Sequence, residues 1–386
     1  MQNQASKMPP NVPQKSDSQA YFCLCMLLLT LFEIVLVTVV LARSFKTVVP
    51  PTTPPPSSGE IQTEDNTPTE DPKPSIPVFA AGTTMPLPRS DSSTATVTNE
   101  IGSQYAALID AESGKILAGK NADTKFAPAS MTKVMTLIVA CEMLNESDLE
   151  REVTMTDDIL QYVTSGAYKG TSRATFDIGE RVKIKDLLYG IGVESYSDCT
   201  IMVVSALCPA PTLAQSEQQF VARMNQKVKD MGLDNTNFDN TVGHEGENNY
   251  STASDMAAIM SYALQCPLIK DVLSKEQYVF YVQYTDETGA DKEYRFTYYS
   301  TLFNANSKGS SRIKAYETHY GKTFSLSGAT FGGGKTGSLG EGTVYTYSLV
   351  SYAVKDGKIY VLVTGETSRA YEVMHDAKIL YDTYVK

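Results

Sequence analysis

The sequence predicts an α/β protein of the α+β type, an antiparallel sheet flanked by helices with a helical subdomain inserted between its strands. Strand patterns open the globular part, helical patterns fill its middle, and strand patterns return towards the C-terminus. Because the strand patterns lie at both ends and the helical ones between them, we expect one sheet built from both ends, with helices on its faces.

The globular part is predicted over residues 100–386, where the composition becomes that of a folded domain. A first strand over Gln104–Asp110 is predicted to turn through Glu112–Lys115 into a second strand over Ile116–Ala118. Apolar residues then recur at helical spacing from Ser130 to about Gln265. This long run predicts the inserted helical part.

The C-terminal third alternates between strand and turn signals. Strands are predicted over Tyr278–Tyr284 and Tyr294–Tyr298, and again over Thr343–Val354 and Lys358–Gly365, each pair separated by a glycine-containing turn. The last segment, Ser368–Tyr384, has the pattern of an amphipathic helix.

The first hundred residues differ in composition from the rest. A polar tail over residues 1–20 precedes an apolar run over 21–42, long enough to cross a bilayer. Because the tail carries Lys7 and Lys15, we expect it to stay cytoplasmic and the rest to be exported, which gives a single-pass protein of the cell membrane. The alternative is a signal peptide cleaved after Ala42 and a secreted protein. Residues 43–99, rich in Pro, Thr and Ser, predict an extended spacer.

Composition excludes several function classes. The net charge of −11 argues against nucleic acid as a partner. With three His and no Cys-x-x-Cys pair, neither a metal site nor a cofactor is predicted. Four cysteines outside the apolar run are expected to be buried free thiols, with three full disulfide pairings as the alternative: Cys141, Cys199, Cys208 and Cys266.

The stretch Ser130-Met131-Thr132-Lys133 carries the clearest chemistry. Residues three apart share one face of a helix, so the amine of Lys133 can take the proton of the Ser130 hydroxyl and make it a nucleophile without histidine. A second Ser-x-x-Lys, Ser311–Lys314, has no helical pattern after it. We expect those two side chains to be ordinary surface residues.

Two further motifs complete a plausible site. Lys335-Thr336-Gly337 follows three glycines; its charge and hydroxyl can hold a carboxylate, and Gly337 leaves a strand edge bare for an extended peptide. Ser195-Tyr196-Ser197-Asp198 offers a second hydroxyl for proton transfer. Taken singly, the Lys-Thr-Gly motif also fits a glycine-rich turn with a solvated lysine. The second motif also fits a helix start with Ser195 or Ser197 as N-cap. His244 is expected to lie at the surface of a polar loop.

Together the motifs and their flanks resemble the serine-type D-alanyl-D-alanine carboxypeptidases, the low-molecular-mass penicillin-binding proteins. The resemblance covers roughly Gln104–Lys386, and it includes ALIDAESGKILAGKNADTKFAPASMTKVMT, DIGERVKIKDLLYG, SEQQFVARMNQKVKDMGLDNTNFDN and YSTASDMAAIM. The three boxes also occur in the family order, Ser-x-x-Lys, Ser-x-Asn and Lys-Thr-Gly.

The resemblance implies a β-lactamase/transpeptidase-like fold and a substrate, the peptidoglycan stem peptide, from which the terminal D-Ala is removed through an acyl-enzyme. It implies that β-lactams inhibit by acylating the same serine. The implied catalytic residues are Ser130 as nucleophile, Lys133 as general base and Ser195 as proton relay. Lys335 and Thr336 would bind the carboxylate beside Gly337. The implied oxyanion hole is formed by the backbone N–H groups of Ser130 and Ser338.

Three departures from the family pattern stand out. Ser197 occupies the place of the Asn in the second box, and a shorter hydroxyl positions a substrate less well. The segment from about Lys275 to Phe331 is longer than usual, and the chain ends soon after its last helix, so the N-terminal anchor is expected to serve for membrane attachment. The alternatives are a D,D-endopeptidase acting on cross-links and a weakened penicillin-binding or wall-sensing protein.

Overall fold

The computed structural model describes residue 79 and residues 85–303, 311–341 and 344–386. The predicted tail and anchor, and the greater part of the spacer, lie outside the described residues. The fold takes in residues N-terminal to position 100, because Ala95–Thr96 (β1) pairs with the strand Ile116–Lys120 (β3). The spacer prediction over 43–99 therefore extends too far.

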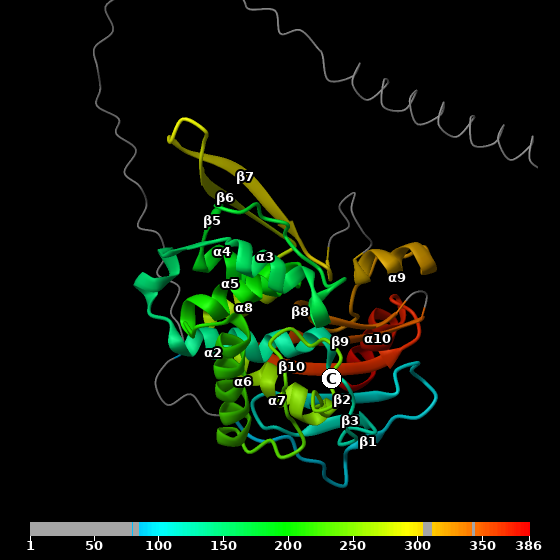
Figure 1. The fold of residues 1–386 in the computed structure, drawn as a ribbon. Helices are drawn as coiled ribbons and strands as arrows, with labels where there is room; N and C mark the ends of the chain where they lie inside the picture. Colours follow the sequence, from blue (N-terminus) through cyan, green and yellow to red (C-terminus); the bar gives the residue numbers. More distant parts are fainter. Residues whose placement is uncertain (1–78, 80–84, 304–310, 342–343) are drawn as a thin grey trace, which may run out of the picture. The chain divides into compact units, whose positions relative to one another are not determined.

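A six-stranded sheet built from both ends of the domain forms the centre of the fold (Figure 1). Its order is β1-β3-β2-β10-β9-β8, antiparallel throughout except for β1 with β3. The further strands are Tyr105–Asp110 (β2), Thr330–Glu341 (β8), Val344–Lys355 (β9) and Lys358–Thr367 (β10). Leu108 of β2 lies opposite Leu362 of β10, which joins the two ends of the domain as predicted.

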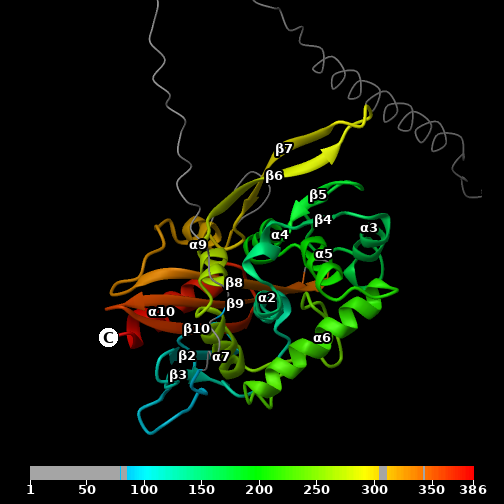
Figure 2. The ribbon, with the colours of Figure 1, turned by 90° about the vertical axis from the view of Figure 1, so that its left-hand side faces the viewer.

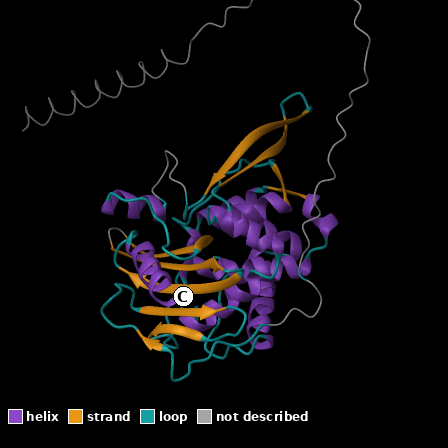
Figure 3. Cartoon of the chain, turned by 180° about the vertical axis from the view of Figure 1, so that it is seen from behind, coloured by secondary structure: helices purple, strands orange, loops and turns teal. Residues whose placement is uncertain are grey.

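Alternating side chains give this sheet two buried faces. Ala106 and Leu108 point towards the core under the last helix, Glu372–Tyr384 (α10), whereas Ala107 and Ile109 point towards the larger helical core. α10 lies across one face (Figure 3), and the helix Ala253–Ala263 (α7) packs on the other. The predicted antiparallel sheet with helices on its faces is confirmed.

The helical middle is also confirmed, with short 3-10 turns and strands between its helices. The helices are Lys133–Met143 (α2), Asp157–Thr164 (α3), Ile184–Val193 (α4), Ser197–Leu207 (α5), Leu213–Asp230 (α6), α7 and Pro267–Ser274 (α8). Threonine caps begin three of them, as at Thr252, whose hydroxyl accepts from the backbone N–H of Asp255 at 3.0 Å. Within the described part of the chain, no single helix is long and apolar enough to cross a membrane; α7 and α8 pass that test only as a pair bent by 113°.

A second, four-stranded sheet has the order β4-β5-β6-β7. Its strands are Glu152–Thr154 (β4), Arg181–Lys183 (β5), Gln277–Thr285 (β6) and Asp291–Tyr299 (β7). The predicted pair of strands, β6 and β7, forms a hairpin that projects from the body (Figure 2).

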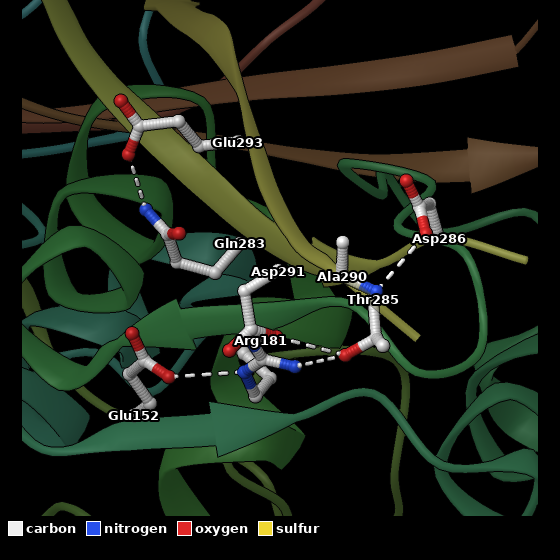
Figure 4. Close-up of polar contacts among 8 residues, drawn as sticks. All are labelled: Glu152, Arg181, Gln283, Thr285, Asp286, Ala290, Asp291 and Glu293. Carbon is white, nitrogen blue, oxygen red and sulfur yellow. Dashed lines mark hydrogen bonds and ion pairs between the residues drawn. The ribbon is translucent and has the colours of Figure 1, made fainter. Parts of the chain in front are cut away.

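Arg181 of β5 joins this hairpin to the domain (Figure 4). Its guanidinium donates to Glu152 at 3.1 Å, to Thr285 at 3.1 Å and to Asp291 at 2.9 Å, so one side chain connects β4 with both strands of the hairpin. In the turn, the Asp286 carboxylate accepts from the backbone N–H of Ala290. Two residue pairs further from the turn, Gln283 donates to Glu293 across the strand pair. The hairpin is thus held close to its turn by a side chain from outside the hairpin.

Two sequence expectations need correction. A helix, Arg312–Tyr320 (α9), does follow the second Ser-x-x-Lys. Ser311 is not a surface residue: it is buried and its Oγ caps α9, accepting from the backbone N–H of Lys314 at 3.1 Å. The four cysteines are buried free thiols, as expected.

Candidate functional site

Ser130 lies in a 3-10 turn, Ala129–Thr132, that leads directly into α2. Ala129 adopts a left-handed φ of +52°, a conformation that costs a non-glycine residue about 1 kcal/mol or more. The turn is held there because α2 is almost wholly buried, with Val134, Leu137 and Ile138 each 0% exposed. The packing of the helix therefore fixes the position of the Ser130 hydroxyl.

The amine of Lys133 reaches back to that hydroxyl. Its Nζ lies 3.4 Å from Ser130 Oγ and donates to the carbonyl oxygen of Val242 at 2.8 Å. The side chain is only 2% exposed, and this burial lowers the pKa of Lys133 to about 7. A large share of the amine is therefore neutral at neutral pH and can accept a proton.

The loop that carries Val242 is itself held in place by α6. Glu217 of α6 accepts from the backbone N–H of Thr241 at 2.9 Å and from its hydroxyl at 2.8 Å. Gly243, at φ +83°, lies so close to the nucleophile turn that an added Cβ would be 1.8 Å from the carbonyl oxygen of Ala129. The sequence did not point to Glu217 or Gly243, since each contacts a part of the chain that is distant in sequence.

Ser195 and Ser197 lie at the junction of α4 and α5. Ser195 has a left-handed φ of +65°, and among the described residues neither its buried Oγ nor that of Ser197 has a hydrogen-bond partner. The N-cap alternative for these serines is wrong, because α5 begins at Ser197 with Tyr196 in the cap position and no side-chain cap bond. Neither hydroxyl is therefore engaged by another group of the described residues.

Lys335, Thr336 and Gly337 lie within β8 rather than before it. An added Cβ on Gly337 would lie 3.1 Å from Cβ of Ala129, so β8 packs directly on the turn that holds Ser130. Thr336 Oγ1 hydrogen-bonds Thr301 Oγ1 at 2.8 Å. The alternative of a glycine-rich turn with a solvated lysine is wrong, because Lys335 is 0% exposed and its Nζ donates to the carbonyl oxygen of Thr336 at 3.0 Å.

One cleft of about 750 Å³ brings these elements together. Of the residues predicted from sequence, six line it: Ser130, Lys133, Ser195, Ser197, Thr336 and Ser338. Lys335 lies behind the wall, and Gly337 faces the Ser130 turn. His244, expected in a surface loop, is half-buried and lines the cleft, with its ring edge against Tyr168.

The cleft wall also contains residues that sequence reasoning missed, foremost Arg312 and Thr301. Arg312 was visible only as an unassigned position in the second Ser-x-x-Lys. Burial lowers the pKa of Lys335 well below its usual value, and the charges of Lys133 and Arg312 lower it further. Across the described ranges, no group of three or more His, Cys, Asp or Glu could hold a metal ion.

Comparison with known proteins decides the family. The family model for D-alanyl-D-alanine carboxypeptidase matches residues 91–324, more than half of the chain. The chain belongs to the D-alanyl-D-alanine carboxypeptidase family. The family match contains the first two boxes and ends before Lys335, which β8 places behind the wall of the same cleft.

Individual relatives and a solved structure support this family assignment. The chain is 35% identical over 160 residues to the D-alanyl-D-alanine carboxypeptidase DacF of Bacillus subtilis and 33% identical over 161 residues to DacA of Escherichia coli. Each alignment spans 42% of this chain and 38% of the relative. The crystal structure of the Streptomyces K15 DD-transpeptidase is similar with a TM-score of 0.61 and 26% identity, over 76% of this chain and 100% of that one. The fold is therefore the β-lactamase/transpeptidase-like fold.

Proposed function

We propose that this protein is a serine D,D-carboxypeptidase that removes the terminal D-Ala from peptidoglycan stem peptides. The observation that carries the proposal is the buried Lys133 amine, with its pKa of about 7, within 3.4 Å of the Ser130 hydroxyl in a cleft that Ser195 and Thr336 also line. A hydroxyl beside a neutral amine is an acylating nucleophile that needs no histidine.

Acylation begins when Ser130 Oγ attacks the carbonyl carbon of the penultimate D-Ala and its proton passes to Lys133 Nζ. The developing oxyanion accepts from the backbone N–H groups of Ser130 and Ser338. The C–N bond to the terminal D-Ala then breaks. The leaving nitrogen receives the proton held by Lys133 through the hydroxyl of Ser195, and D-Ala departs as a free amino acid.

Substrate is held along β8, the edge strand of the sheet. An extended peptide can lie beside this strand with its carboxylate towards Thr336 and Ser338, in front of the buried Lys335. Gly337 lets β8 lie close to the Ser130 turn, so that clamp and nucleophile act on one peptide. Ser197 faces the same cleft without a hydrogen-bond partner among the described residues.

Water then attacks the ester between Ser130 and the acyl group, the ester C–O bond breaks, and the proton taken from water returns to Ser130 Oγ. A β-lactam, whose strained amide replaces the D-Ala-D-Ala bond, would acylate Ser130 in the same way. Turnover therefore shortens the stem peptide by one residue and regenerates the free hydroxyl.

The test is release of D-Ala from a stem pentapeptide by the purified protein, with a labelled penicillin as a second readout. We expect one D-Ala per peptide and one penicillin adduct on the tryptic peptide that contains Ser130, and loss of both in Ser130→Ala. Cross-linked muropeptides in a parallel reaction separate this activity from an endopeptidase, which would yield monomers. Absence of both D-Ala release and labelling in the wild type would refute the proposal.

We further propose that residues 21–42 anchor the protein in the cell membrane, with the catalytic domain on the outside. The apolar length of this segment and the basic residues before it support this arrangement. Full-length protein should stay with membranes after alkaline washing, whereas a protein beginning at Ser44 should be released. Recovery of the mature N-terminus just after Ala42 would instead identify a cleaved signal peptide.

A further inference from the structure

The hairpin β6–β7, which projects from the body in Figure 2, has one face that the domain covers and one that it leaves open. Side chains alternate between the two faces of paired strands. Phe280 and Tyr298 point inwards, where they are 5% and 0% exposed and their ring centres lie 4.7 Å apart. The neighbouring positions point the other way and form the outer face of the hairpin, which comprises Val279 and Tyr281 of β6 and Arg295, Thr297 and Tyr299 of β7.

Two side chains of the outer face are exposed and lack partners. Tyr281 and Arg295 lie directly opposite each other across the strand pair, and Tyr281 is 50% exposed. Among the described residues, the Tyr281 ring contacts no other aromatic ring and no cation, and Arg295 forms no ion pair. Tyrosine and arginine are, with tryptophan, the residue types that contribute most binding energy at recognition surfaces.

The outer face is continuous with the catalytic cleft. Tyr299, the last residue of β7, belongs to this face and lines the cleft. Its backbone N–H donates to the carboxylate of Glu194 at 2.6 Å, next to Ser195. Two residues further on, Thr301 hydrogen-bonds Thr336 of β8 at 2.8 Å. A molecule whose end occupies the cleft can therefore continue outwards along the hairpin.

The dimensions of the outer face favour a linear polymer over a folded protein. Each strand has nine residues, so the face is about 30 Å long and, with strands about 4.8 Å apart, about 10 Å wide. Its area of roughly 300 Å² is well below the ~800 Å² per partner that a stable protein–protein interface buries. Arg181 bonds to Thr285 of β6 and Asp291 of β7, which holds the two strands together close to the turn.

We propose that the outer face binds the glycan strand to which the stem peptide is attached. The ring of Tyr281 offers a flat apolar surface to the C–H face of a sugar, and its hydroxyl offers a hydrogen-bond donor. The guanidinium of Arg295 offers donors to the carboxylates of neighbouring stem peptides on the same strand. The proposal rests on the carboxypeptidase function proposed above and extends it: the preferred substrate is assembled peptidoglycan rather than a free stem peptide.

Binding of fluorescently labelled glycan chains to the full-length protein in detergent tests the proposal. Fluorescence anisotropy compares two probes, uncross-linked strands with their stem peptides and the same strands after an amidase has removed the peptides. Tyr281→Ser should weaken the binding of both probes about tenfold, because an aromatic contact is lost. Arg295→Gln should weaken only the strands that keep their peptides. A wild type that binds neither probe, or a Tyr281→Ser protein that binds bare chains as the wild type does, would overturn the proposal.

D-Ala release provides a second readout. In Tyr281→Ser, KM for pentapeptide-bearing strands should rise about tenfold, while KM for the free pentapeptide, kcat and penicillin acylation stay unchanged. Lys292→Gln, an exposed residue on the opposite face of β7, is the matched control and should behave as wild type in both assays. Equal changes in KM for strands and free peptide would place the effect in the cleft and overturn the proposal. If glycan chains bind but neither substrate releases D-Ala, it is the carboxypeptidase function that fails.

Discussion

At the residue scale, the central feature is the amine of Lys133, whose pKa is lowered by burial. The spacing of Lys133 indicated that its amine could reach Ser130, because residues three apart share a helix face, and the family resemblance implied its role as the base. Its partner carbonyl, that of Val242, lies 109 residues further along the chain and could not be predicted. Local spacing thus gives the reacting pair, whereas the desolvation that makes it reactive arises from distant segments.

The pH dependence of acylation should follow this lysine. Only neutral Lys133 can accept the proton of Ser130, and its pKa is lowered to about 7, so the rate should rise through neutral pH and reach a plateau above about pH 8. Below pH 6 the rate should fall about tenfold per pH unit, in step with the neutral fraction. Stopped-flow acylation by a fluorescent penicillin measures it; a flat profile from pH 5 to 8 would contradict the assignment.

Ser197 gives a second prediction at this scale. Its buried hydroxyl has no hydrogen-bond partner among the described residues, whereas an Asn there could donate to a substrate carbonyl and accept from Lys133. Ser197→Asn should raise the acylation rate several-fold, by about 1 kcal/mol of added hydrogen bonding. Ser197→Ala is the matched control and should not raise it. An unchanged or slower rate in the Asn variant would show that the hydroxyl is not the limiting departure.

At the element scale, tight contacts position the nucleophile turn. β8 and the loop after Asn240 both approach it with a glycine, and at Gly243 an added Cβ would overlap the turn. The strand itself was only partly predicted, because the run Gly332–Gly334 weakens the strand signal. The fold explains that run: a Cβ on Gly333 would lie 2.3 Å from the carbonyl oxygen of Leu273, and one on Gly334 would lie 2.2 Å from that of Val350.

Gly243→Ala tests the contact between loop and turn. The new Cβ would lie 1.8 Å from the carbonyl oxygen of Ala129, and φ is +83°, so we expect a loss of about 2–4 kcal/mol of unfolding free energy and slower acylation. Gly289→Ala is the matched control, because it has the same φ of +83° with nothing within 4 Å of the added Cβ. It should cost only about 1 kcal/mol and leave acylation unchanged. Urea unfolding measures both; equal losses would contradict the contact.

α9 shows why another element escaped prediction. Its sequence, Arg-Ile-Lys-Ala-Tyr-Glu-Thr-His-Tyr, is polar around most of the helix, so no apolar stripe marks it. The helix is instead held by aromatic packing, as of Tyr316 on Phe324, and by the Ser311 cap. Such contacts come from residues outside the helix and leave no periodic signal within it.

At the scale of the whole molecule, the hairpin β6–β7 is a projection that Arg181 holds close to its turn. Its strands were predicted, but the four-stranded sheet was not, because β4 and β5 have only three residues each. Arg181 supplies the long-range tie, and its ion pairs raise the pKa of its guanidinium, with Asp291 the largest contributor.

Arg181→Gln should loosen the hairpin without unfolding the domain. We expect a protease to cleave the turn Asp286–Ala290 faster than in the wild type. The melting temperature should change little, since exposed ion pairs contribute little to global stability. Arg295→Gln, an exposed arginine on the hairpin itself, is the control and should leave the cleavage rate unchanged. Mass spectrometry of timed digests gives the rates. Equal rates in both variants would show that Arg181 does not restrain the hairpin.

The pairing of β2 with β10 has a consequence for biosynthesis. The strand that completes the middle of the sheet is made more than two hundred residues after its neighbour, so during synthesis β2 has an open edge where β10 will later pair. Contacts so distant in sequence form slowly. The sheet should therefore stay incomplete during synthesis until β10 has left the ribosome.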